Sequence, residues 1–291
     1  MNLVQLLKRL KPTPIADLTL PRYLFGSFRR KSISFYNGLT DENTIVYWFQ
    51  SKSFSIDLRL PDGNRTALHE RQGWIGDTIW DSQTALLSWE IQQSYQNHIQ
   101  WPEPAKLYPI GNSILEFAPS NAYVEDWRQQ ANKGLFFGLR LFQMQCLKTE
   151  QIFPVDGGLV ITDQHIAYAQ SRFPQIQQQI NQYATLAEVN DLKSEIESYE
   201  VSITLNGSII CWSTKSNQIG QTILLDHFEL LEDQTITQLK MIGDDKYLLY
   251  FKLDVYQPDF VFDHISACSD SGQQWLAQEQ NHLLKHAKTT I

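Results

Sequence analysis

Residues 45–63 read Ile-Val-Tyr-Trp-Phe-Gln-Ser-Lys-Ser-Phe-Ser-Ile-Asp-Leu-Arg-Leu-Pro-Asp-Gly, and this stretch sets the β-sheet pattern of the first half of the chain. The runs 45–50 and 54–60 are rich in aromatic and β-branched side chains, and the short gap between them is typical of a β-hairpin. In the second run, apolar residues at 54, 56, 58 and 60 alternate with Ser55, Asp57 and Arg59. Pro61-Asp62-Gly63 then supplies a turn.

The register of this hairpin decides where its polar side chains lie. If the connecting loop has an even number of residues, Trp48 faces Asp57 or Arg59, and one face gathers a ring, a carboxylate, a guanidinium and the amide of Gln50. If the loop has three residues, Trp48 pairs with Ile56 and the charges lie on the opposite face. The first arrangement predicts a lumen in which a few polar groups orient a mostly apolar ligand, with Arg59 holding an acidic or carbonyl end. The second predicts an ordinary solvated face.

Tryptophans are concentrated in this half of the chain and indicate the kind of β structure. They are Trp48, Trp74, Trp80, Trp89, Trp101 and Trp127. Rings of this size need a wide, covered interior, which favours a β-barrel. Trp74, Trp80 and Trp89 either stack on a flat ligand or simply fill the barrel, and of these three Trp89 is our candidate for the binding site.

Two further strands are predicted at 107–110 and 114–118, after one at 85–91. Glu116 shares a strand face with Ile114 and Ala118. If that face is internal, burial raises the pKa of Glu116, which is the usual route to a general acid. Exposure of Glu116 at a strand edge is the alternative.

The second half has a similar supply of strands. We predict them at 135–142, 159–162, 199–205, 208–212, 221–231, 235–242 and 247–255. Asn206-Gly207 is a two-residue hairpin turn, and the strands after it form an antiparallel meander, the local topology of up-and-down barrels. Pro174 and the apolar spacing after it predict a helix at about 175–198, and a further helix follows Asp270.

These elements predict a mainly β protein with two tandem antiparallel β-barrels and accessory helices. The polar stretch 125–133 marks the seam between the two. Residues 1–130 would form an N-terminal lid helix and the first barrel, and residues 131–291 the second barrel with its inserted and C-terminal helices. The lid would pack Leu3, Leu6, Leu7 and Leu10, although an interfacial membrane helix also fits this basic, amphipathic segment. A single large sandwich is the alternative fold.

Several segments in this order resemble a known group of proteins. The segments are Trp48-Phe-Gln50, Asp57-Leu-Arg59-Leu-Pro61, Leu115-Glu116, Glu125-Asp-Trp127-Arg128 and residues 158–168, Gly-Leu-Val-Ile-Thr-Asp-Gln-His-Ile-Ala-Tyr. Together they resemble calycin-like, lipocalin-related two-barrel proteins of unassigned function from fungi and bacteria, over roughly residues 25–260. The resemblance implies two calycin-like barrels and supplies no catalytic residues.

Composition narrows the function classes. The formal charge of −8 and the lack of a long Lys/Arg run argue against nucleic-acid binding. No stretch approaches the roughly 18 apolar residues of a transmembrane helix, and three widely spaced cysteines indicate neither a disulfide framework nor a zinc site, so we expect a cytoplasmic protein. No cofactor or metal motif is present, and we expect neither group.

Three functions therefore stay open. The preferred one is a non-catalytic binder of a hydrophobic or amphipathic small molecule at Trp48, Gln50, Asp57, Arg59, Trp89 and Glu116. The second is a scaffold with filled barrels for a protein partner. The third is a hydratase or isomerase of an apolar substrate, with Glu116 or Asp57 as acid or base. A lumen whose carboxyl groups have ordinary pKa values would favour the binder. Carboxyl groups that converge in the lumen and have shifted pKa values would favour the enzyme.

Overall fold

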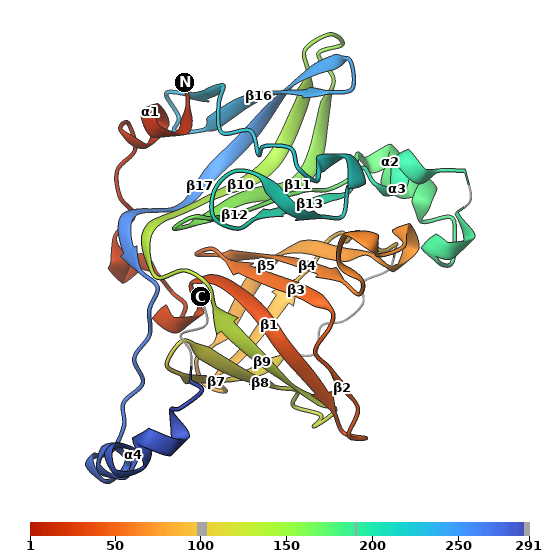
Figure 1. The fold of residues 1–291 in the computed structure, drawn as a ribbon. Coiled ribbons are helices and arrows are strands. Elements are labelled where there is room, and N and C mark those ends of the chain that lie inside the picture. Colours follow the sequence, from red (N-terminus) through yellow and green to blue (C-terminus); the bar gives the residue numbers. More distant parts are fainter. Residues whose placement is uncertain (98–103, 190, 288–291) are drawn as a thin grey trace.

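The computed structural model describes residues 1–97, 104–189 and 191–287. These residues form two antiparallel sheets, and the second sheet packs against one side of the first (Figure 1). Trp101 and part of the predicted helix at 175–198 lie outside the described residues. None of the described helices is long and apolar enough to cross a membrane.

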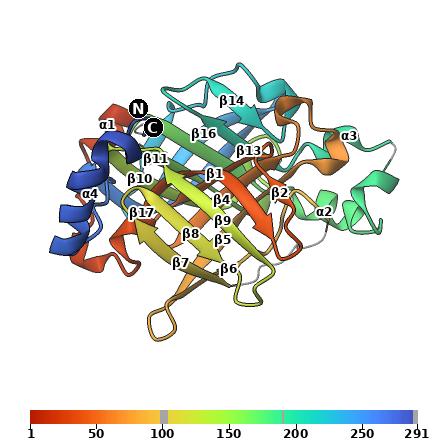
Figure 2. The same cartoon turned by 60° about the horizontal axis from the view of Figure 1, so that its bottom comes forward.

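The first sheet closes into an eight-stranded antiparallel barrel, which confirms the barrel predicted for the first half. Each strand pairs with the next, and β9 pairs back onto β1 (Figure 2). The strands are β1 (Gly26–Phe35), β3 (Ile45–Gln50), β4 (Phe54–Leu60), β5 (Gln72–Asp81), β6 (Leu86–Glu90), β7 (Ala105–Ile110), β8 (Ser113–Phe117) and β9 (Tyr123–Gln129). A two-residue strand, β2 (Thr40–Asp41), pairs with the end of β1.

The hairpin of β3 and β4 has the register of an even loop. Trp48 pairs with Asp57, and the amide N–H of Ser51 donates to the carbonyl of Phe54 at 2.9 Å, so the turn itself is Lys52-Ser53. Trp48, Asp57 and Arg59 therefore share one face, and this face lines the lumen. The apolar residues of β4 form the outer face of the barrel wall.

The predicted seam at 125–133 is wrong in its first part, because Glu125–Gln129 belong to β9. Glu125, Trp127 and Gln129 alternate inward and are buried. Their polar groups are satisfied inside the barrel, so a polar composition here does not indicate a linker. Only residues 130–132 lie between β9 and β10 (Lys133–Cys146).

The second half forms an open eight-stranded sheet, so the predicted second closed barrel is not what the structure shows. From edge to edge, its order is β14, β13, β12, β11, β10, β17, β16, β15. The strands after β10 are β11 (Ile152–Thr162), β12 (His165–Gln170), β13 (Glu200–Thr204), β14 (Ile210–Ser213), β15 (Phe228–Leu230), β16 (Ile236–Ile242) and β17 (Asp245–Val261).

Hydrogen bonding explains why the two edges of this sheet do not meet. The strand predicted at 221–231 is reduced to β15, and before it the chain makes only one bridge to the opposite edge, Ile209 with Thr222. The backbone N–H and C=O of Phe228 are both bonded to Met1, and Leu3 donates to Leu225. These groups are therefore unavailable to β14.

The N-terminal helix, α1 (Leu3–Leu7), packs on the second sheet. Leu3 and Leu6 are buried in one cluster with Phe137, Leu139 and Phe228, with Leu7 and Leu10 packed against it. The predicted lid therefore covers the second sheet, although the first barrel follows it in the chain.

The other helical segments are short, apart from the last. The region predicted as one helix at about 175–198 contains α2 (Pro174–Ile180), η5 (Leu186–Glu188) and α3 (Lys193–Ile196). Each of these three segments buries one apolar residue, Ile180, Leu186 or Ile196, in the same core. The apolar spacing that predicted one long helix therefore arises from three short helical segments. The remaining one-turn 3-10 helices are η1 (Ile15–Asp17), η2 (Arg22–Leu24), η3 (Gly63–Arg65), η4 (Leu68–Glu70) and η6 (Ser216–Gln218).

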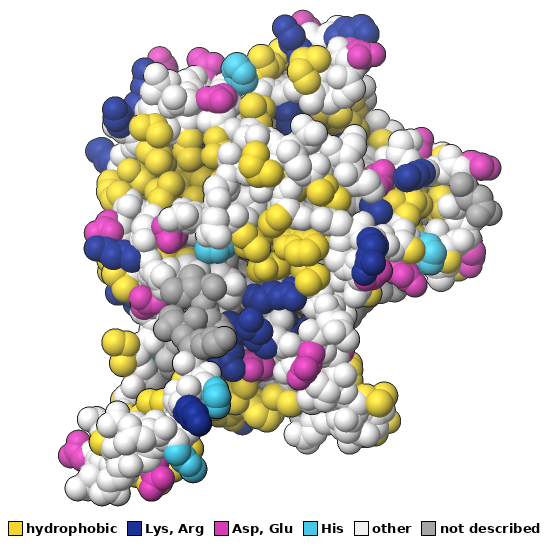
Figure 3. Space-filling model, viewed as in Figure 1, with side chains coloured by type: hydrophobic (Ala, Val, Ile, Leu, Met, Phe, Trp, Pro, Cys, Tyr) yellow, Lys and Arg dark blue, Asp and Glu magenta, His cyan; other side chains and the backbone are white. Residues whose placement is uncertain are grey.

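The predicted C-terminal helix is α4 (Asp270–Leu283), capped by the Ser269 side chain. It buries none of its residues and stands away from the body of the protein (Figure 3).

The outer wall of the barrel and the second sheet share an apolar core. Phe54, Ile56 and Leu58 of β4 belong to one buried cluster with Val160, Ala167 and Ala169 of the second sheet, and with Val201 and Ile203. Glycine permits the close approach: a Cβ at Gly158 would lie 2.8 Å from the ring of Phe54. The barrel therefore carries an apolar exterior on this side and a partly polar interior.

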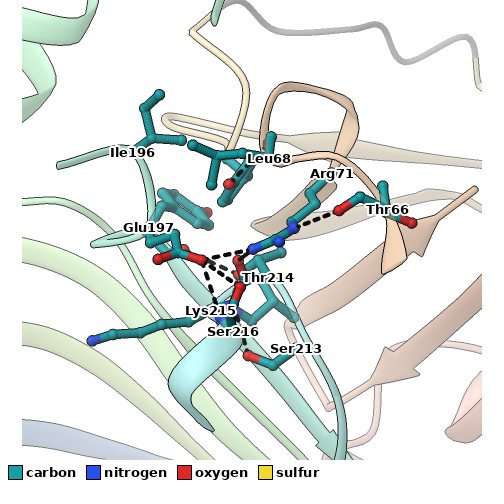
Figure 4. Close-up of polar contacts among 12 residues, drawn as sticks. Thr66, Leu68, Arg71, Ile196, Glu197, Ser213, Thr214, Lys215 and Ser216 are labelled. Atoms are coloured by element: carbon teal, nitrogen blue, oxygen red, sulfur yellow. Dashed lines mark hydrogen bonds and ion pairs between the residues drawn. The ribbon is translucent and has the colours of Figure 1, made fainter. Parts of the chain in front are cut away.

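A buried arginine also joins the two halves (Figure 4). Arg71 lies just before β5, and its guanidinium donates to Glu197 Oε1 at 2.8 Å and to the carbonyl of Thr214 at 2.9 Å. The same guanidinium reaches the carbonyl of Thr66 at 3.1 Å, within the first half. One side chain thus holds a loop of the barrel against two segments of the second half.

Candidate ligand-binding site

The lumen of the first barrel contains a cavity of about 450 Å³. Its lining residues are Arg30, Ile33, Phe35, Asp41, Thr44, Trp48, Asp57, Arg59, Pro61, Gln72, Trp74, Trp89, Glu116, Tyr123, Glu125 and Trp127. The half-exposed Phe35 and its strand partner Tyr123 belong to the end of the barrel where β1 ends and β9 begins. The volume suits one small molecule.

Indole rings form much of the wall. The Trp48 ring meets Trp127 at a centroid distance of 5.8 Å and Trp89 at 6.3 Å, both close to edge-on. Trp74 extends the group through Trp89 at 5.8 Å. Because the rings stand at steep angles, they present both faces and edges to the cavity.

The base of the lumen is fixed by hydrogen bonds. Trp48 Nε1 and Trp89 Nε1 both donate to Ser55 Oγ, at 3.0 and 3.1 Å. Ser55 in turn donates to Gln50 Oε1 at 2.7 Å. Gln50 is fully buried and does not line the cavity. It supports the Trp48 and Trp89 rings through Ser55.

Charged side chains are buried within the lumen. Asp57, Glu116 and Glu125 are only 2%, 5% and 3% exposed. Arg59 Nε donates to Asp57 Oδ1 at 2.8 Å, and Arg30 donates to Glu125 at 2.8 Å and to Asp41 at 3.1 Å. Buried charges are tolerated only when they are paired or neutralised, and these pairs meet that requirement.

Glu116 is the exception to this pairing. Its carboxylate accepts a hydrogen bond from Trp127 Nε1 at 2.9 Å, and among the described residues it forms no ion pair. Burial, and then the nearby charge of Glu125, raise the pKa of Glu116 well above its ordinary value, although Arg59 opposes the change. Glu116 therefore keeps its proton more readily than an exposed glutamate does.

The other titratable groups report a negative potential in the lumen. Burial raises the pKa of Asp57, and the neighbouring Arg59 only partly offsets it. Burial alone would lower the pKa of Arg59, yet the carboxylates of Asp57, Glu125 and Glu116 outweigh it and raise that pKa. A guanidinium that holds its proton more strongly after burial is surrounded by an excess of negative charge.

Five of the six residues singled out from the sequence line this one cavity: Trp48, Asp57, Arg59, Trp89 and Glu116. Trp74, which the sequence offered as a possible stacking ring, also lines the cavity, and Trp80 does not. The sequence did not single out Arg30, Glu125 and Trp127 as site residues. The signal for Glu125 was its place two residues before Trp127 on a strand, which puts both on one face. Arg30 gave no such signal, because its partner Glu125 is 95 residues away and meets it only when the barrel closes.

A second cavity, of about 500 Å³, lies in the second half. Its lining includes Lys246 and Lys240, and the Lys240 ammonium lies 4.2 Å from the centre of the Tyr168 ring and 3.9 Å from Glu200. This cavity has no tryptophan in its lining. The aromatic walls that can hold an apolar molecule are therefore those of the first barrel.

Comparison of the chain with protein-family models, with curated proteins and with solved structures gave no match.

Proposed function

We propose that the protein binds a hydrophobic or amphipathic small molecule in the lumen of its first barrel and does not transform it. The observation that carries this proposal is the cavity of about 450 Å³, walled by four indoles and furnished with buried, ordered charges. A barrel that served only as a packed scaffold would fill this space with side chains. A small number of fixed polar groups in an apolar pocket is the arrangement that orients a ligand.

A calycin-like identity is part of the same proposal. It is supported by the closed eight-stranded antiparallel barrel, which is the architecture that holds one small ligand in such proteins. The open second sheet departs from the two-barrel pattern. We also propose a cytoplasmic location, supported by the three cysteines, all of which are free thiols.

Native mass spectrometry of the full chain tests the proposal. We expect an adduct of small-molecule mass that organic extraction removes, and a titratable site for the neutral fluorescent probe N-phenylnaphthylamine on the extracted protein. Trp89→Ala should weaken binding of the probe, because it removes one wall of the cavity. Trp275→Ala, on the exposed helix α4, should leave the affinity for the probe unchanged. A parent protein with neither adduct nor probe binding would refute the proposal and favour a scaffold for a protein partner.

One observation favours a second candidate, a hydratase or isomerase of an apolar substrate. Glu116 and Asp57 both have raised pKa values, which is the property of a general acid at neutral pH. The two carboxyl groups line one cavity, which is the arrangement we expected of an enzyme. We nevertheless rank the enzyme second because Asp57 is held by Arg59, so that Glu116 alone is left for proton transfer. Incubation of the extracted ligand with the protein in D₂O separates the two. A binder leaves the ligand unlabelled, whereas an isomerase or hydratase introduces deuterium, and Glu116→Gln should abolish that labelling.

A further inference from the structure

The charges of the lumen do not balance. Its lining contains four carboxyl groups, those of Asp41, Asp57, Glu116 and Glu125, and two guanidinium groups, those of Arg30 and Arg59. Arg30 is shared between Glu125 and Asp41, and Arg59 is held by Asp57. Within the described residues, the hydrogen bond to the Glu116 carboxylate comes from the neutral N–H of Trp127. Among the described lining residues, two guanidinium groups therefore face four carboxyl groups, and Glu116 is the carboxyl group that forms no ion pair.

This arrangement disfavours an anionic ligand. Each arginine already donates to carboxylate oxygens, so an incoming acid would have to displace a buried partner. It would also face Glu116 and Glu125, which lie directly opposite each other. From the sequence, Arg59 alone suggested a ligand with an acidic end. The structure instead places an excess of carboxyl groups around Arg59, and these would repel an acid.

The same site suits a cation. The faces of indole rings attract ammonium groups, and the attraction is strongest where the cation is removed from water. Trp127 both lines the cavity and donates to Glu116, so that an aromatic wall and a carboxylate lie side by side. Trp48 stands nearly perpendicular to Trp127 at 5.8 Å and provides a second wall.

We infer that the ligand is a primary amine carried on an apolar, flat body, with its ammonium group beside the Glu116 carboxylate and the indoles of Trp48 and Trp127. This inference rests on the proposed function and specifies its ligand class. The apolar body lies against Trp89 and Trp74, further along the same wall.

Proton release provides a signature for this mode of binding. Without a bound cation Glu116 tends to keep its proton, because it is buried and faces Glu125 from β9. On β4, Asp57 adds to this effect and Arg59 opposes it, while Arg30 of β1 lines the same cavity. An ammonium group favours the carboxylate form and expels that proton to solvent. Amine affinity should therefore fall as the pH is lowered, because the proton then competes with the ligand.

A matched series of three probes tests the inference on the extracted full-length protein. Naphthylmethylamine, naphthylmethanol and naphthoic acid share one apolar body and differ in charge. By isothermal titration calorimetry we expect the amine to bind about tenfold or more tightly than the alcohol, since a charge-assisted hydrogen bond is worth at least that factor. Titrations of the amine in buffers of different ionisation enthalpy should show net proton release.

Glu116→Gln provides the matched variant, because an amide oxygen can still accept from Trp127. It should erase the preference for the amine and the proton release while leaving the alcohol unaffected. Glu229→Gln, at an exposed position on β15 of the second sheet, should change neither. The parent's proton release gives an independent reading should Glu116→Gln fold poorly.

The outcomes separate this inference from the function on which it rests. If the alcohol or the acid binds as well as the amine, or if N-phenylnaphthylamine binds and none of the three probes does, the amine assignment is overturned and the lumen remains a binding site. If the fluorescent probe also fails to bind, both proposals fall together.

Discussion

Glu116 on β8 and Glu125 on β9 are directly opposite each other inside the first barrel. Like charges in this position destabilise a sheet, and burial adds the cost of removing carboxylates from water. Arg30 pairs with Glu125 at 2.8 Å, whereas Glu116 forms no ion pair with the described residues and Arg59 offsets its charge only in part. A position that opposes folding in this way is typical of sites kept for binding or catalysis.

The first prediction follows from the raised pKa of Glu116. The folded protein binds the Glu116 proton at pH values where the unfolded chain has released it, so this group makes the free energy of unfolding fall as the pH rises from the ordinary glutamate pKa through the raised one. Glu116→Gln removes that loss. The variant should be more stable than the parent above neutral pH, by about 1.4 kcal/mol for each unit between the folded and unfolded pKa.

Urea unfolding between about pH 5 and pH 8 measures this difference. The stability gain of Glu116→Gln should shrink toward the acid end, because the pH has then only just passed the ordinary glutamate pKa and the parent has lost little stability. Glu229→Gln serves as the exposed control and should give no such trend. A gain that is the same at every pH would show that Glu116 titrates normally.

The second prediction concerns the pair of Asp57 and Arg59, which are two residues apart on β4. Arg59→Met should cost about 3 to 5 kcal/mol of unfolding free energy, because it leaves the Asp57 carboxylate buried without its cation. Adding Asp57→Leu should restore most of that loss. A double-mutant cycle by urea denaturation gives the coupling, and single-variant losses that simply add would show that the two groups act independently.

The local pattern of the sequence was sufficient to predict the first barrel. The alternation of residues 54–60 predicted both the strand and the separation of Asp57 and Arg59 from Ile56 and Leu58. The sequence left open which face is internal, because that depends on the register at Lys52-Ser53 and on what covers the outside. The cover is Val160, Ala167 and Val201, at least 100 residues away in the chain, and no local pattern contains that information.

In the second half of the chain, local sequence patterns were not sufficient to predict the fold. Its apolar content between 221 and 231 predicted a long strand, yet the chain forms only Phe228–Leu230 there. The deciding contacts are backbone hydrogen bonds from Met1 and Leu3, at the far end of the sequence. Strand propensity could not foresee that these residues would occupy the edge on which a closing strand would pair.

The third prediction tests the contact between the two sheets. A methyl group at Gly158 would lie 2.8 Å from Phe54 Cε2 and 2.9 Å from the carbonyl oxygen of Leu139, which cannot move without disturbing β10. Gly158→Ala should therefore cost about 1 to 3 kcal/mol, as overpacking does in other cores. Thermal or urea denaturation measures the loss.

Gly272→Ala is the control for this substitution. Gly272 lies in the exposed helix α4, where a methyl group would meet only the side chains of Cys268 and Ser269. Alanine is the better helix former, so this variant should be no less stable than the parent. If Gly158→Ala were equally harmless, the sheets would not be in the tight contact that the structure shows.

The last prediction concerns Arg71, the guanidinium that joins the barrel to the second half (Figure 4). Arg71→Met keeps the apolar stem and removes the bonds to Glu197 and Thr214, which should cost about 2 to 4 kcal/mol because a partly buried carboxylate and a buried carbonyl lose their donor. Arg65→Met removes a nearby guanidinium that is 85% exposed and paired with Asp62. Arg65→Met should change the free energy of unfolding by no more than about 0.5 kcal/mol.

Unfolding followed separately by tryptophan fluorescence and by far-ultraviolet circular dichroism distinguishes two ways in which Arg71→Met could act. Most tryptophans belong to the barrel, so fluorescence reports mainly on the first half, whereas the circular dichroism signal comes from both sheets. If Arg71 couples the halves, the two transitions coincide in the parent and separate in Arg71→Met. Equal losses from Arg65→Met and Arg71→Met would mean that the buried contacts to Glu197 and Thr214 do not hold the halves together.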